Sequence, residues 1–100
     1  MSTILEKQYE EKVCKKILRE FPGAIILKLD SLFIQGIPDR LVLFEDTWAS
    51  LEIKRNSSSR IQPNQSFYVK KLNQMSYASF LNPTNEREVF RDLQRLFRSD

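Results

Sequence analysis

The chain contains 100 residues, 41% of them hydrophobic and 29% charged, which are ordinary proportions for one globular domain. With Cys14 as the sole cysteine and no histidine, an internal disulfide, a structural zinc site and a Ser-His-Asp triad are excluded. The sequence shows neither a membrane-spanning apolar run nor a signal-peptide pattern, so we expect a cytoplasmic protein. The net charge of +3 and pI near 9.2 lean weakly towards an anionic partner, and any bound metal should be a hard cation held by oxygen.

Residues 4–21 have the apolar spacing of an amphipathic helix, which residues 22–23 (Pro-Gly) end. Its apolar face comprises Tyr9, Val13, Cys14, Ile17, Leu18 and Phe21. Glu10 falls in the middle of this face, Glu6 near it and Glu11 at its edge. A glutamate among core-facing residues is costly without a partner. Glu10 is therefore expected either to pair with a lysine at the surface or to point along the helix towards a functional site.

Residues 24–29 are rich in apolar and β-branched side chains and predict a first strand. The following loop, residues 30–36, contains Leu32, Phe33 and Ile34, and is more apolar than a solvated loop needs to be. These side chains can cover a site, contact a substrate or pack in a dimer, and the sequence does not choose among the three.

Residues 38–44 and 47–54 predict a β-hairpin whose only polar punctuation is Glu45-Asp46. Neither of these residues is glycine or asparagine, so a tight two-residue turn is not favoured, but a four-residue loop on the same centre keeps the same register. That register pairs Phe44 with Thr47 and Val42 with Ala49, and it places Asp39 opposite Glu52.

Directly opposed residues of an antiparallel pair have Cβ atoms about 4.5–5.5 Å apart. Lys54 projects from the same face as Glu52, because side chains alternate along a strand. Asp39, Glu52 and Lys54 thus converge at one end of an apolar hairpin, which indicates a site. The alternative is that Asp39 follows a turn and that Glu52 and Lys54 form a solvated charge pair on an edge strand.

The second half of the chain predicts a connector, a helix, a strand and a last helix. Residues 56–60 are serine-rich and read as a flexible connector, or as a mobile loop that contacts phosphates. Residues 63–75 form a helix with Gln65, a polar residue, on its inward face. Residues 77–81 form a fourth strand, and a helix that starts from Asn85 contributes an apolar stripe to the core or to a dimer contact. The element order α-β-β-β-α-β-α predicts an α/β fold with a mixed four-stranded sheet flanked by helices.

A helix glutamate, a Pro-Asp pair at a strand start and Glu-x-Lys on the next strand together resemble the PD-(D/E)xK nuclease superfamily. More narrowly, residues 36–40 (GIPDR), 51–55 (LEIKR) and 63–65 (PNQ) resemble the VRR-NUC (virus-type replication-repair nuclease) family. The similarity runs from the first helix to about Pro83. It implies a restriction-endonuclease-like core in a single nuclease domain, residues 1–100, of the stand-alone phage or bacterial type.

The resemblance also implies roles for individual residues. Asp39 and Glu52 match the metal-binding acids, Lys54 the catalytic lysine and Gln65 the family glutamine, for which Gln62 is the weaker candidate. The backbone carbonyl of Ile53 is expected to be a further metal ligand. Glu10 is the preferred helix acid, with catalytic and metal-binding roles, and Glu11 and Glu6 remain alternatives. The expected metal is Mg²⁺ or Mn²⁺, and the expected nucleic-acid contacts are Arg40, Arg55, Ser58, Arg60, Lys70 and Lys71.

The implied activity is that of a structure-selective DNA endonuclease that acts on branched DNA, similar to a Holliday-junction resolvase, as a homodimer. The same site can instead serve a flap enzyme, an exonuclease, a nicking enzyme or an RNase, because substrate choice resides in loops and dimer geometry. Two further alternatives are a non-catalytic nucleic-acid-binding module and a protein-interaction domain.

Overall fold

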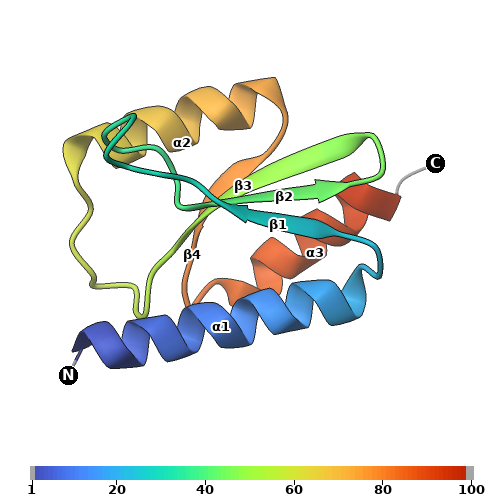
Figure 1. The fold of residues 1–100 in the computed structure, drawn as a ribbon, viewed down its shortest axis with the longest axis horizontal. Helices are drawn as coiled ribbons and strands as arrows, with labels where there is room; N and C mark the ends of the chain where they lie inside the picture. The colour runs from blue at the N-terminus through green and yellow to red at the C-terminus, as the bar shows by residue number, and fades with distance from the viewer. Residues whose placement is uncertain (1, 99–100) are drawn as a thin grey trace.

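The computed structural model describes the backbone of residues 2–98 and the side chains of residues 5–98. Its elements follow the predicted order, with boundaries shifted by one or two residues: α1 (Ser2–Glu20), β1 (Ile25–Lys28), β2 (Arg40–Phe44), β3 (Thr47–Ile53), α2 (Pro63–Met75), β4 (Ala78–Leu81) and α3 (Glu86–Arg98). Figure 1 shows α2 on one side of the sheet and α1 and α3 on the other. The predicted α/β architecture is therefore confirmed.

The four strands form one mixed sheet in the order β1-β2-β3-β4, antiparallel except between β3 and β4. The hairpin has the predicted register, with Phe44 opposite Thr47 and Val42 opposite Ala49. The turn between its strands was not predicted correctly. It contains only Glu45 and Asp46, and Glu45 has a φ of 55°. The apolar strands set the register, and the exposed Glu45 takes the unfavourable backbone conformation that this register requires.

The core lies between the sheet and the α1–α3 layer. Phe21, directly after α1, meets Phe44 of β2 and Phe97 of α3 there, with ring centroids 5.1–5.7 Å apart. The apolar stripe of α3 belongs to this core, because Val89, Phe90, Leu93 and Phe97 are all buried. Since the core holds α1 against the sheet, the position of the α1 glutamates relative to β2 is determined by packing.

Helix α2 covers the opposite face of the sheet over β3 and β4. Its predicted inward residues, including Gln65 and Tyr68, are half-buried, and no residue of this helix is fully buried. On the same sheet face as Leu41 and Leu43, β1 presents Ile25 and Leu27, which remain 56% and 42% exposed. Within residues 2–98, the structure contains no helix long and apolar enough to cross a bilayer.

Candidate active site

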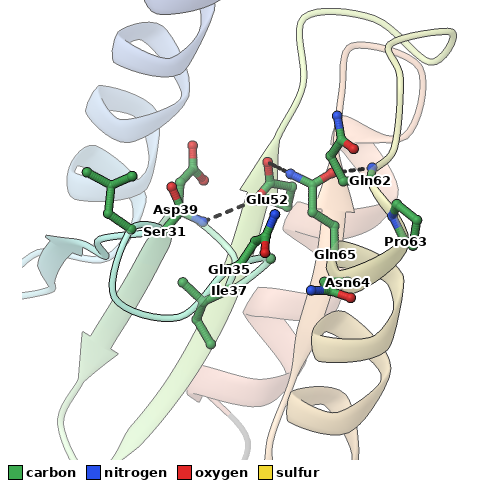
Figure 2. Close-up of a pocket in the computed structure, with 11 residues that line it drawn as sticks. Ser31, Gln35, Ile37, Asp39, Glu52, Gln62, Pro63, Asn64 and Gln65 are labelled. Carbon is green, nitrogen blue, oxygen red and sulfur yellow. Dashed lines mark hydrogen bonds between the residues drawn. The ribbon is translucent and has the colours of Figure 1, made fainter.

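The end of the β2–β3 hairpin brings two carboxylates together. Asp39 immediately precedes β2, and Glu52 lies near the end of β3. Because Arg40 of β2 pairs with Leu51 of β3, Asp39 and Glu52 are the residues next to this pair. The backbone N–H of Asp39 donates to Glu52 Oε1 at 3.2 Å (Figure 2). The N–H of Ile53 donates to Asp39 Oδ1 at 3.4 Å. Each carboxylate thus accepts a bond from the backbone of the opposite chain segment. These bonds explain why β2 begins at Arg40 rather than at the predicted residue 38.

Glu52 is also bound by two predicted site residues. Lys54 Nζ lies 3.4 Å from Glu52 Oε2, and Gln65 Nε2 donates to the same oxygen at 3.0 Å. The amide oxygen of Gln65 accepts from the backbone N–H of Gln62 at 2.9 Å, which fixes the direction in which the amide points (Figure 2). The structure therefore joins Asp39, Glu52, Lys54 and Gln65 in one cluster, in which Gln62 takes part through its backbone.

Burial raises the pKa values of both carboxylates. Glu52 is only 6% exposed, and its burial, with the charge of Asp39, raises its pKa to about 7 although Lys54 acts in the opposite direction. Burial also raises the pKa of Asp39, against the lowering effects of the Arg40 charge and the Ile53 hydrogen bond. A bound cation would stabilise the ionised form of these two adjacent carboxylates.

Glu10 faces this site from α1 and forms an ion pair with an arginine rather than a lysine. Arg40 Nη2 lies 2.9 Å from Glu10 Oε1, with the two side chains 14% and 17% exposed. Burial, and next the charge of Asp39, raise the pKa of Glu10. Glu11 is exposed and Glu6 half-buried, so Glu10 is the acid of α1 that the structure joins to the end of β2. Arg40, predicted to contact nucleic acid, also donates to the carbonyl of Asp39 at 3.3 Å and so links Glu10 to the site.

The donor set suits a hard, oxygen-preferring cation. Two carboxylates are sufficient for Mg²⁺, which retains several waters and uses substrate phosphate oxygens as further ligands. Among the described residues, no group of three or more acidic, cysteine or histidine side chains is placed to hold a metal ion. The metal-ligand roles of Glu10 and of the Ile53 carbonyl therefore stay predictions, whereas Asp39 and Glu52 provide a compatible pair.

The two carboxylates line a cavity of about 660 Å³. Its other walls are residues 31–32 and 35–37, which belong to the loop after β1, and residues 62–65 at the start of α2. Gly36 makes this arrangement possible, because its φ is +92° and a Cβ at this position would lie 2.3 Å from the Cβ of Asn64. From the sequence, Gly36 could be identified only as part of a motif, and Ser31, Gln35 and Asn64 were not predicted as wall residues. The glycine two residues before Pro38 was the available signal.

The remaining predicted nucleic-acid contacts lie outside the cavity lining. Arg60, Lys70 and Lys71 are exposed, and Arg55 is half-buried. Ser58 is exposed and bonds through its N–H and hydroxyl to Asn56 Oδ1, at 3.0 and 2.8 Å, so this segment is a side-chain-stabilised turn. The role of these residues in binding nucleic acid stays a prediction.

Comparison with known proteins supports the same fold. No protein-family model matches the sequence, and no curated protein matches it closely enough to count as a relative. A solved structure described as a "VRR_NUC domain protein" is similar over 94% of this chain and 88% of that chain, with a TM-score of 0.66 and 16% identity. At that identity the similarity concerns the fold. The chain thus has the fold of a VRR_NUC domain protein.

Proposed function

We propose that this protein is a VRR-NUC-type endonuclease that hydrolyses phosphodiester bonds of branched DNA with the help of a divalent metal ion. The observation that carries the proposal is that two adjacent carboxylates, the buried Glu52 and the half-buried Asp39, line one cavity, and that Lys54 pairs with Glu52. Adjacent carboxylates that line a cavity and whose pKa values are raised by burial are typical of functional sites.

Each residue of the site has a separate proposed role in hydrolysis. Mg²⁺ or Mn²⁺, held by Asp39 and Glu52 with the carbonyl of Ile53, would supply Lewis acidity to the scissile phosphate and lower the pKa of a water molecule. The Lys54 ammonium group would orient the attacking water or neutralise charge that develops on the phosphate. Gln65 keeps the Glu52 carboxylate in position through its bond to Oε2.

Glu10 acts from the outer side of the site. Its ion pair with Arg40, which also binds the carbonyl of Asp39, holds the segment that presents the Asp39 carboxylate. Glu10 is therefore proposed as an outer-shell residue, with direct contact to the metal as the alternative.

Exposed basic residues outside the cavity would bind the sugar-phosphate backbone. Arg60, Lys70 and Lys71 can contact phosphates, together with Arg55 and Ser58, and such contacts position nucleic acid without reading its sequence. Cleavage is therefore proposed to depend on DNA structure. A domain of 100 residues presents little surface to a branched substrate, so a homodimer that makes two paired cuts, like a Holliday-junction resolvase, is part of the proposal.

The test is metal-dependent cleavage of a four-way junction, a flap and a plain duplex. Asp39→Asn and Lys54→Ala should each lower kcat by about 10²- to 10⁴-fold, the usual contribution of a catalytic acid, base or charge-stabilising group. Asp46→Asn and Lys15→Ala are matched controls, because both residues are exposed and lie outside the cavity lining. If Asp39→Asn cleaves as the wild type does, the proposed site is wrong.

Product mapping and molecular mass distinguish the specificities. Symmetric paired nicks made by a dimer support the resolvase-like activity, whereas cuts confined to flaps or strand ends indicate a different nuclease with the same site. Metal-dependent binding of these substrates without cleavage would identify a binding module and refute the enzymatic proposal.

A further inference from the structure

The loop after β1 presents two adjacent large apolar side chains to solvent, and the first of them, Leu32, lines the cavity. Leu32 is 93% exposed and Phe33 is 86% exposed, while Ile34 is 39% exposed. Side chains of this size are rarely left in water at adjacent positions unless they meet a partner. Neither side chain is buried over the site.

The loop holds these side chains in a defined position. Asp30 organises its start, since its carboxylate accepts from the N–H of Leu32 at 2.8 Å and its carbonyl accepts from the N–H of Phe33 at 3.1 Å. At its other end, Gly36 is packed against Asn64 of α2. In Figure 2, Ser31 and Ile37 lie on one side of the two carboxylates, and the start of α2 lies on the other side. The loop is therefore a wall of the cavity whose tip faces solvent.

The position of Leu32 indicates the kind of partner. Leu32 lines the same cavity as Asp39 and Glu52, so a protein surface that covered it would obstruct the entrance to the carboxylates. A nucleic-acid strand can satisfy both features at once, with its phosphate in the cavity and a neighbouring base against the apolar rim. Aromatic and aliphatic side chains are the groups on which unstacked bases rest.

We infer that Leu32 and Phe33 form a stacking platform for an unpaired base next to the scissile phosphate. This inference rests on the proposed nuclease function and deepens it, because branch points and flaps supply bases that are already unstacked. The platform would favour such DNA over continuous duplex without any hydrogen bond to a base edge. It would therefore account for selectivity for structure rather than sequence.

A double-mutant cycle between protein and DNA tests the platform. A single abasic site is moved along the strand on both sides of the mapped cut, and each substrate is cleaved by the wild type and by Phe33→Ala. Phe33→Ala should lower kcat/KM on intact DNA by about 5- to 100-fold, the range expected for a lost base–aromatic stack. At one position the abasic site should cost the wild type a similar factor and cost Phe33→Ala nothing further, because the two changes remove the same contact.

Phe67→Ala is the matched control, because Phe67 is an aromatic residue 60% exposed on α2, outside the loop that carries Leu32 and Phe33. It should change kcat/KM little, and its effect should add to that of every abasic site. Phe33→Tyr should retain the coupling, since its ring also stacks. If no abasic position couples to Phe33→Ala while the wild type still cleaves, the platform is refuted and the nuclease proposal stands.

A fluorescence measurement tests the same contact without catalysis. Phe33→Trp in a Lys54→Ala background should lose tryptophan emission when a flap substrate is added, and Phe67→Trp in the same background should not. Trp48, the single native tryptophan, is half-buried, and its signal is subtracted with the Lys54→Ala parent. Quenching that depends on protein concentration without DNA, or equal quenching at both positions, would overturn the inference in favour of a protein contact. If the wild type cleaves no substrate, the nuclease proposal fails, and this titration still decides whether the loop binds a base.

Discussion

In the metal-free protein, Glu52→Gln should destabilise the fold at acidic pH and stabilise it at alkaline pH. Glu52 has a pKa of about 7 in the folded chain, against 4.5 for an ordinary glutamate. Between these values the folded state holds a proton that the unfolded state has released, so the free energy of unfolding falls as pH rises. The destabilisation caused by the ionised Glu52 side chain is absent below about pH 4.5 and complete above about pH 7. A glutamine at position 52 does not ionise, so it causes no such pH-dependent destabilisation.

The size of the effect follows from the same pKa values. A change from 4.5 to about 7 corresponds to roughly 3 kcal/mol at 1.36 kcal/mol per pH unit, and solvent screens it little because Glu52 is 6% exposed. The amide can accept only some of the bonds that the carboxylate accepts from Asp39, Lys54 and Gln65, which costs about 1 kcal/mol at every pH. The variant should therefore be about 1 kcal/mol less stable than the wild type near pH 4.5 and about 2 kcal/mol more stable at pH 8.

Denaturant unfolding at a series of pH values from 4.5 to 8, with a metal chelator present, measures this difference. Far-UV circular dichroism reports the transition for both proteins. Glu11→Gln is the matched control, since Glu11 is an exposed glutamate on α1, and its curve should run parallel to that of the wild type. The wild type and Glu52→Gln should not run parallel, although Asp39 and Glu10 leave the variant with a residual slope of the same sign. Parallel curves for these two proteins would refute the reasoning that burial and a neighbouring carboxylate destabilise the ionised Glu52.

Three further outcomes can be measured on the same material. Mg²⁺ at about 100 times its Kd should raise the free energy of unfolding at pH 8 by about 2.7 kcal/mol in the wild type; no stabilisation would contradict a metal site. Gly36→Ala should destabilise the fold by about 2–5 kcal/mol, because positive φ and overlap with Asn64 act together, whereas Gly23→Ala, where φ is +95° and no atom lies within 4 Å, should cost about 1–2 kcal/mol. Equal losses in these two variants would show that the packing at Asn64 is unimportant. Arg98→Ala should lower stability by about 1–2 kcal/mol, because its guanidinium donates to the carbonyl of Glu20 at 2.6 Å at the end of α1; an unchanged thermal midpoint would argue against this cap.

The register of the hairpin and the pairing of its acids could be predicted from local patterns. The apolar runs at residues 41–44 and 48–51 pair in only one way that keeps one face in the core, and that pairing carries Asp39 to Glu52. The inward position of Gln65 followed from helical spacing in the same way, and the structure places its amide on Glu52. The shape of the turn was missed, because the strands on either side, and not the turn residues, decide it.

The cavity wall could not be predicted, because its residues come from segments with no periodic pattern. The contact of Gly36 with Asn64 joins a loop to the start of a helix that lies later in the chain. The partner of Glu10 was equally hidden, since Arg40 reaches it only after α1 has packed against the sheet. Loop residues Leu32 and Phe33 are apolar and therefore compatible with burial, and only the folded chain shows that both are exposed and that Leu32 shares a cavity with the carboxylates.

The alternation of apolar and polar residues was therefore sufficient to predict the order of the elements, the strand register and the proximity of Asp39, Glu52 and Lys54. These features depend on periods of two and 3.6 residues and on short connections, which a linear pattern can encode. The pairing of Glu10 with Arg40, the raised pKa values and the shape of the cavity were decided by tertiary packing. They depend on which surfaces exclude water from one another, and that is a property of the assembled layers and not of any single segment.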